Sequence, residues 1–162
     1  MPKQQTINKP VSLKGVGIHT GDEVNLTFKP AKENYGYCFC RTDLPEKPII
    51  EANIKYVVNT ERGTNLDKNG IKIKTSEHVL AALVGLEIDN VEIELNASEP
   101  PIMDGSSKFF VEALEFAGKK ELNEKRKEFV VRNIISYKDS KSGSEITIIP
   151  SSEYQITTMV DF

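Results

Sequence analysis

The sequence has little of the chemistry that several protein classes require. Its two cysteines, Cys38 and Cys40, are too few for a disulfide framework, and this fits the reducing cytoplasm as the expected location. No apolar run is long enough to span a bilayer, and the first ten residues lack the apolar region of a secretory signal, so we do not expect an integral membrane protein. The formal net charge of -3 argues against a protein that binds nucleic acid through its phosphates.

What remains is the composition of an ordinary globular protein. The chain has 162 residues, of which 38% are hydrophobic and 28% are charged. This balance is typical of a folded domain and not of a disordered segment. The length suffices for one domain with a hydrophobic core and part of a second.

Hydrophobic patterning predicts a β-rich first part. Val24, Leu26 and Phe28 alternate with polar residues, which predicts a half-buried strand over residues 23–29. Further strands are expected over residues 35–42, 49–58 and 91–95. The Asp-Lys-Asn-Gly sequence at 67–70 lies between apolar residues and predicts a hairpin turn.

Two helices are expected in the same part. One begins at Glu77, with Thr75 or Ser76 as its cap, and its apolar residues through Leu86 predict a helix buried on most of its faces. The other begins at Ser106 or Ser107, after a loop at 100–106, and ends before Gly118. Strands and helices in this proportion predict an α+β fold, a two-layer sandwich in which a β-sheet carries two helices on one face.

The charge pattern suggests three parts. Residues 1–118 form the first α+β domain, and the mostly charged residues 119–128 are expected to be a connector in solvent. Strands are then expected over 129–137, 145–149 and 154–162, with no helix to cover them. Because an uncovered terminal strand exposes its edge and its apolar face, we expect the chain to be the front part of a longer protein whose second domain opens at residue 129.

Glu77 and His78 are the first candidates for chemistry. They are the two ionisable residues between Lys74 and Glu87, and they stand at the start of the predicted helix. A zinc hydrolase needs an imidazole to bind the metal and a carboxylate to accept a proton from water. Taken alone, the pair also fits an acid that complements the helix dipole beside a surface histidine.

His19 is the other histidine in the chain, and it lies among Gly15, Gly17 and Gly21. Glycines permit sharp turns and close approach of a ligand, but the same pattern fits a hairpin with an exposed histidine at its tip. Cys38 and Cys40 lie two apart in a predicted strand and lack a second cysteine pair, so buried thiols are favoured over a metal site.

Five motifs taken together resemble one family. In chain order they are GVGIHTG (15–21), FKPA (28–31), RTDL (41–44), SEHVLAALVGLEIDN (76–90) and EPPIMDGS (99–106). The chain resembles the zinc-dependent UDP-3-O-acyl-N-acetylglucosamine deacetylases of lipid A biosynthesis over essentially its whole length. The resemblance implies two domains of similar topology, with the active site between them and the second domain beginning near residue 129.

The resemblance also implies roles for three residues. Glu77 would be the general base, His78 one zinc ligand, and His19 a residue near the substrate. The reaction would be hydrolysis of the N-acetyl group of UDP-3-O-(3-hydroxyacyl)-N-acetylglucosamine. The family's other zinc ligands lie in an H-x-x-x-D motif that this sequence does not contain. With one expected Zn²⁺ ligand, the chain alone is expected to be inactive until it meets the remainder of the second domain.

Two other interpretations stay open at this stage. One is a non-catalytic α+β module that binds a protein partner, for which Glu77 and His78 would not be needed together. The other extends the first interpretation, because some relatives of the family are fused to a hydroxyacyl dehydratase. The chain would then be the front part of a bifunctional protein.

Overall fold

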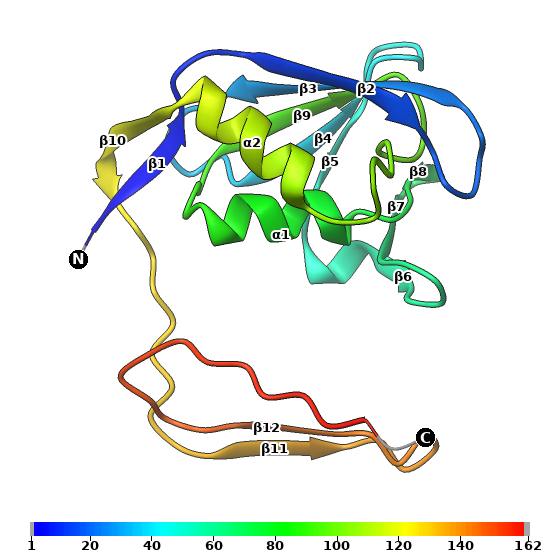
Figure 1. Cartoon of the computed structure of the whole chain (residues 1–162). Helices are drawn as coiled ribbons and strands as arrows, with labels where there is room; N and C mark the ends of the chain where they lie inside the picture. Colours follow the sequence, from blue (N-terminus) through cyan, green and yellow to red (C-terminus); the bar gives the residue numbers. More distant parts are fainter. Residues whose placement is uncertain (1, 161–162) are drawn as a thin grey trace. The chain divides into compact units, whose positions relative to one another are not determined.

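The computed structural model describes residues 2–160 of the chain. The chain divides into two compact units, one ending at Arg126 and the other beginning at Lys127. Each unit is described here by itself, and both are drawn in Figure 1.

The first unit is built around a mixed five-stranded sheet. Its spatial order is β2 (Val11–Val16), β3 (Glu23–Pro30), β9 (Val91–Leu95), β4 (Tyr37–Arg41) and β5 (Ile49–Glu51). All neighbours are antiparallel except β9 and β4, which are parallel. The alternation predicted for β3 is confirmed, because Val24, Leu26 and Phe28 are buried while the residues between them are not.

Two helices cover this sheet, and Figure 1 shows both on one side of it. Helix α1 (Glu77–Gly85) buries Val79, Ala82 and Leu83. Helix α2 (Lys108–Ala117) buries four residues, among them Phe110, whose ring meets Phe28 of β3 edge-on at 6.4 Å. The predicted α+β architecture is therefore confirmed.

Two details of the helix predictions are wrong. Helix α1 is buried on one face and exposes Ala81 and Val84, because the sheet and α2 cover a single side of it. Neither Thr75 nor Ser76 caps α1 with its side chain, since both hydroxyls donate hydrogen bonds elsewhere. The predicted start of α2 is confirmed, because Ser107 directly precedes the helix as its N-cap residue. Gly118 does end α2, with a φ of 71° that favours glycine.

A smaller antiparallel sheet contains β6 (Val57–Asn59), β7 (Asn65–Lys68) and β8 (Ile71–Ile73). The predicted hairpin is confirmed between β7 and β8, where Asn69 and Gly70 both have positive φ. The single strand expected over residues 49–58 is wrong. The 3-10 turn η1 (Ile54–Tyr56) interrupts it, because the Asn53 side chain accepts a hydrogen bond from the Lys55 backbone and caps the turn.

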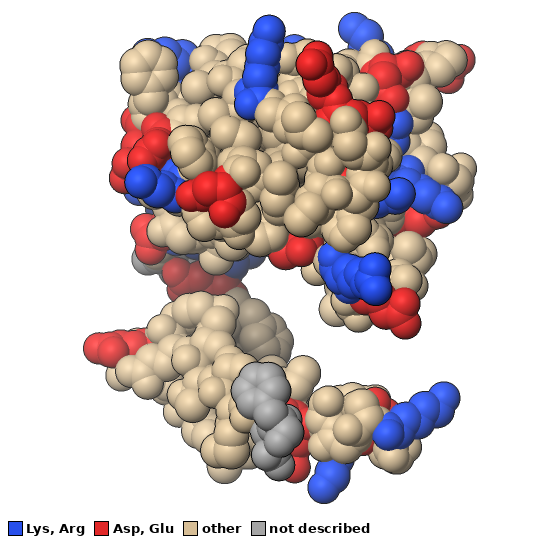
Figure 2. Space-filling view, turned by 45° about the vertical axis from the view of Figure 1, so that its right-hand side comes forward, with Lys and Arg blue, Asp and Glu red and all other residues tan. Residues whose placement is uncertain are grey.

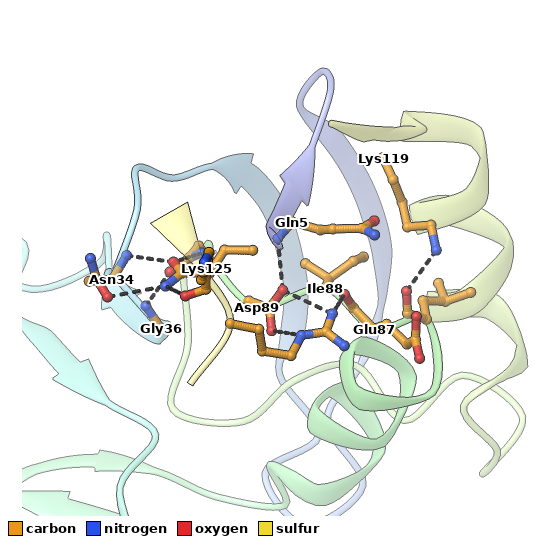
Figure 3. A network of polar contacts seen from close by, with 12 residues as sticks. Gln5, Asn34, Gly36, Glu87, Ile88, Asp89, Lys119 and Lys125 are labelled. Carbon is orange, nitrogen blue, oxygen red and sulfur yellow. Dashed lines mark hydrogen bonds and ion pairs between the residues drawn. The ribbon is translucent and has the colours of Figure 1, made fainter. Parts of the chain in front are cut away.

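The charged connector expected over residues 119–128 is also wrong for most of its length. Strand β10 (Lys119–Lys125) pairs antiparallel with β1 (Lys3–Ile7). All residues of β10 except the partly buried Leu122 are exposed, so its charged composition resembles that of a connector although its backbone is paired. Arg126, which follows β10, donates to both carboxylate oxygens of Asp89 at 2.7 and 3.0 Å. Figure 3 shows Asp89 also accepting from the Gln5 backbone.

The second unit contains one antiparallel hairpin, β11 (Ile135–Lys138) with β12 (Glu145–Ile148). The strands expected over 129–137 and 145–149 are therefore shorter than predicted. All residues of β11 and β12 are exposed, so no described element covers either face of this hairpin. Residues 154–160 form no strand, and the last two residues of the strand expected over 154–162 lie outside the described residues.

The charged residues of the first unit are mixed on its surface. Figure 2 shows Lys and Arg side chains interspersed with Asp and Glu side chains on one face. Over residues 2–160, no helix is long and apolar enough to cross a membrane.

Candidate active site

Glu77 and His78 form the first turn of α1, as the sequence predicts. Their side chains are partly accessible, with 38% of Glu77 and 30% of His78 exposed. Oε1 of Glu77 lies 3.9 Å from Nε2 of His78. A carboxylate and an imidazole therefore stand side by side, within reach of a ligand from solvent.

The start of α1 is fixed from two directions. Oε2 of Glu77 accepts a hydrogen bond from the Thr64 backbone at 2.8 Å, and the Ser76 hydroxyl donates to the Thr64 carbonyl at 2.9 Å. On the other side, the Ser107 hydroxyl at the start of α2 donates to the His78 carbonyl at 2.9 Å. Oε2 of Glu77 is thus held by a backbone N–H, while no backbone group among residues 2–160 donates to Oε1.

Gly63 allows the backbone to pass close to Glu77. Its φ is 149°, in a region that favours glycine. A Cβ at this position would lie 3.3 Å from atoms of Thr75 and 3.4 Å from Oε1 of Glu77. A side chain at residue 63 would therefore strain the backbone and press on Thr75, next to the start of α1.

His19 lies in the turn between β2 and β3, where Gly21 donates to the Gly17 carbonyl at 3.0 Å. Its ring is held by a carboxylate that the sequence analysis did not single out. Nδ1 of His19 lies 2.7 Å from Oε1 of Glu99, and the backbone N–H groups of His19 and Thr20 donate to Oε2 of Glu99 at 2.9 and 3.1 Å.

Glu99 is completely buried, although its sequence context in EPPIMDGS resembles an ordinary loop. Burial acts to raise the pKa of this carboxyl. Hydrogen bonds from Thr75, from the His19 ring and from the two backbone N–H groups outweigh burial and lower the pKa to about 2. Glu99 is therefore ionised at neutral pH, and these hydrogen bonds stabilise its negative charge.

Thr75 connects this carboxylate to the start of α1. Its hydroxyl donates to Oε1 of Glu99 at 2.6 Å, and the same oxygen lies 3.3 Å from Nδ1 of His19. The φ of Thr75 is 49°, which is unusual for a β-branched residue. Thr75 therefore makes its hydrogen bond to Glu99 from a strained backbone conformation. The structure thereby brings His19 and Glu77 into one connected region, although 58 positions of sequence separate them.

The sequence alone could not single out Glu99. A carboxylate before two prolines carries no signal of burial, because its partners come from residues 19, 20 and 75. The glycine-rich stretch gave a hint of close backbone approach. A Cβ at Gly17 would lie 2.8 Å from Oε2 of Glu99, so that glycine makes room for the carboxylate.

The described residues can supply one ligand to a metal ion but not a complete metal site. Among the described residues, no three His, Cys, Asp or Glu side chains are grouped to hold a metal. His78 could supply one nitrogen ligand, with Glu77 beside it. Cys38 and Cys40 are buried, and burial raises the pKa of Cys38 to about 11, as expected for unreactive thiols and not for zinc ligands.

Comparison of the sequence with known proteins identifies one family. The family model described as "LpxC: UDP-3-O-acyl N-acetylglycosamine deacetylase" matches residues 4–162. The chain is 45% identical over 159 residues to the "Bifunctional enzyme LpxC/FabZ" of Chlorobaculum tepidum. The matched region covers 98% of this chain and 34% of that protein.

Other similar proteins carry the deacetylase name alone, and two of them are described here. The "UDP-3-O-acyl-N-acetylglucosamine deacetylase" of Myxococcus xanthus is 39% identical over 98% of this chain and 50% of its own length. The protein of that name from Geotalea uraniireducens is 40% identical over the whole of this chain and 52% of its own length. The chain thus spans about half the length of these two relatives.

Proposed function

The chain belongs to the UDP-3-O-acyl N-acetylglycosamine deacetylase family, and from this premise we propose that it supplies part of a zinc-dependent deacetylase active site. The proposed reaction is hydrolysis of the N-acetyl group of UDP-3-O-(3-hydroxyacyl)-N-acetylglucosamine in lipid A biosynthesis. The names of the relatives support the substrate class. The observation that carries the proposal is the accessible pair Glu77 and His78 at the start of α1.

His78 is proposed to bind the metal, and Glu77 to act as general base. A zinc ion supplies Lewis acidity toward water and toward a carbonyl oxygen. The Thr64 hydrogen bond orients the Glu77 carboxylate and leaves Oε1 available to accept a proton from the attacking water. The water oxygen bonds to the carbonyl carbon of the acetamide, the C–N bond breaks, acetate leaves, and the sugar amine receives the proton taken from water. His19 is proposed to lie near the substrate.

The remaining ligands are proposed to come from outside the described residues, because these contain no three-donor group. The hairpin of β11 and β12 is proposed to open the second domain, in which the rest of the site would lie. The first domain would then extend to Arg126, with β10 as its last strand. The cytoplasm is the proposed location.

A second candidate extends the first. Because three of the similar proteins are named as bifunctional enzymes, the gene product that contains this chain could carry a second activity. The reading frame beyond Phe162 would decide between the two, and it would also show whether an H-x-x-x-D motif follows. A non-catalytic module remains the alternative that the experiment below tests.

The test uses three variants of the complete gene product. Glu77→Gln should reduce deacetylation by about 100-fold or more while zinc content stays unchanged, because it removes a general base. His78→Ala should reduce zinc content itself. Glu112→Gln on the exposed side of α2 is the matched control and should change neither quantity. Full activity in a zinc-loaded Glu77→Gln protein would refute the general-base role.

A further inference from the structure

The buried carboxylate of Glu99 is surrounded by donors of two kinds. On Oε2 both donors are backbone N–H groups, from His19 and Thr20, and a backbone N–H cannot become an acceptor. On Oε1 the partners are the Thr75 hydroxyl and Nδ1 of His19, and either of these groups can change its role. This asymmetry makes the tautomer of the His19 ring depend on Glu99.

We propose that Glu99 is a positioning residue that fixes His19 in its Nδ1-protonated tautomer and leaves Nε2 to accept a hydrogen bond from an O–H or N–H group of the substrate. The part that concerns substrate rests on the proposed function; the tautomer does not. An ionised carboxylate has no proton to donate, so the ring nitrogen 2.7 Å away must be the donor. The ring is 38% exposed, and Nε2 makes no hydrogen bond to a described residue.

Glu99 also holds the two halves of the candidate site together. Its Oε1 accepts from Thr75, which lies two residues before Glu77, while its Oε2 accepts from the turn that carries His19. One buried side chain thus orients the His19 ring and anchors the segment that enters α1. A residue that acts in this way touches no substrate but determines where two candidate site residues lie.

Glutamine at residue 99 should reverse the tautomer. The two backbone donors require an acceptor, so the carbonyl oxygen of Gln must take the place of Oε2. Its NH₂ group then takes the place of Oε1 and points at Nδ1 of His19. Because that group is a donor, Nδ1 must become the acceptor, and the ring proton must move to Nε2.

The experiment is nitrogen NMR of the imidazole rings in the 162-residue chain, near neutral pH. The chain has two histidines, so a His78→Gln variant assigns the His19 signals. The wild type should show a protonated Nδ1 and an unprotonated Nε2, and Glu99→Gln should show the reverse. Thr75→Val is the matched control: it removes the hydroxyl from Oε1, keeps the carboxylate, and should leave the tautomer unchanged.

Two results would overturn the proposal. An Nε2-protonated ring in the wild type would do so at once, even if Glu99→Gln fails to fold. An unchanged tautomer in a folded Glu99→Gln protein would do the same. In the complete gene product, Glu99→Gln and His19→Ala should each reduce deacetylation about ten-fold, and together little more than either alone. Absence of deacetylation in the wild type would refute the proposed function and leave the tautomer result standing.

Discussion

The Glu99 carboxylate should make the stability of the first unit depend on acid. Its pKa is lowered from 4.5 to about 2 in the folded protein. A carboxyl with a lowered folded pKa stabilises the fold above its unfolded pKa, and this stabilisation is lost as the pH falls toward the folded pKa. A pKa shift of this size corresponds to about 3 kcal/mol of folding free energy. Solvent screening does not reduce this contribution, because the Glu99 side chain is completely buried.

Glu99→Gln removes this term, since an amide does not titrate. The free energy of unfolding of wild type minus that of Glu99→Gln should be roughly constant from about pH 7 to pH 6. It should then fall as the solution is acidified, with about 2 kcal/mol lost by about pH 3. Other carboxyls titrate in both proteins, so the difference isolates residue 99.

The assay is urea unfolding followed by helical circular dichroism, because both helices lie in the first unit and the chain has no tryptophan. Equal slopes of unfolding free energy against denaturant in the two proteins would show that the same surface unfolds. A difference that stays flat from about pH 6 to pH 3 would refute the argument, because Glu99 would then titrate alike in both states.

Three further outcomes follow from the site. Gly17→Ala should destabilise the first unit by about 1–3 kcal/mol, since its Cβ would lie 2.5 Å from the Thr20 hydroxyl and 2.8 Å from Glu99. The control is Gly85→Ala, which has open space around it and should be neutral or stabilising in thermal melts. In the complete gene product, His19→Ala should lower turnover or substrate affinity about ten-fold, and unchanged activity at low substrate concentration would leave His19 as a turn residue. The isolated chain, dialysed against trace zinc, should hold less than one zinc ion and show no deacetylation; one tightly bound zinc ion per chain with turnover would contradict this.

Local sequence patterns predicted the strands and helices in which buried apolar residues recur at regular spacing. The alternation of Val24, Leu26 and Phe28 identified β3, and Gly118 identified the end of α2. The pairing of β1 with β10 could not be predicted in this way. Residues 119–125 show no apolar alternation, because their contribution is backbone hydrogen bonding to a strand more than a hundred residues away.

The residues of the candidate site also differ in whether local sequence could predict them. Glu77 and His78 were visible because two ionisable residues interrupt an apolar run, and their proximity follows from adjacency. Glu99 was not visible, since burial of a carboxylate depends on donors that the fold brings from distant segments. The roles of Glu77, His78 and His19 stay predictions until the experiments above are done.

The pairing of β1 with β10 also bears on how the protein is made. Strand β1 contains Ile7, which is completely buried, yet its partner comes from residues 119–125. During synthesis the first strand therefore leaves the ribosome long before its partner exists, and contacts between such distant segments form slowly. Strand β1 is therefore among the last segments of the first unit to be paired, and until β10 emerges its unpaired edge is open to chaperones and to other nascent chains.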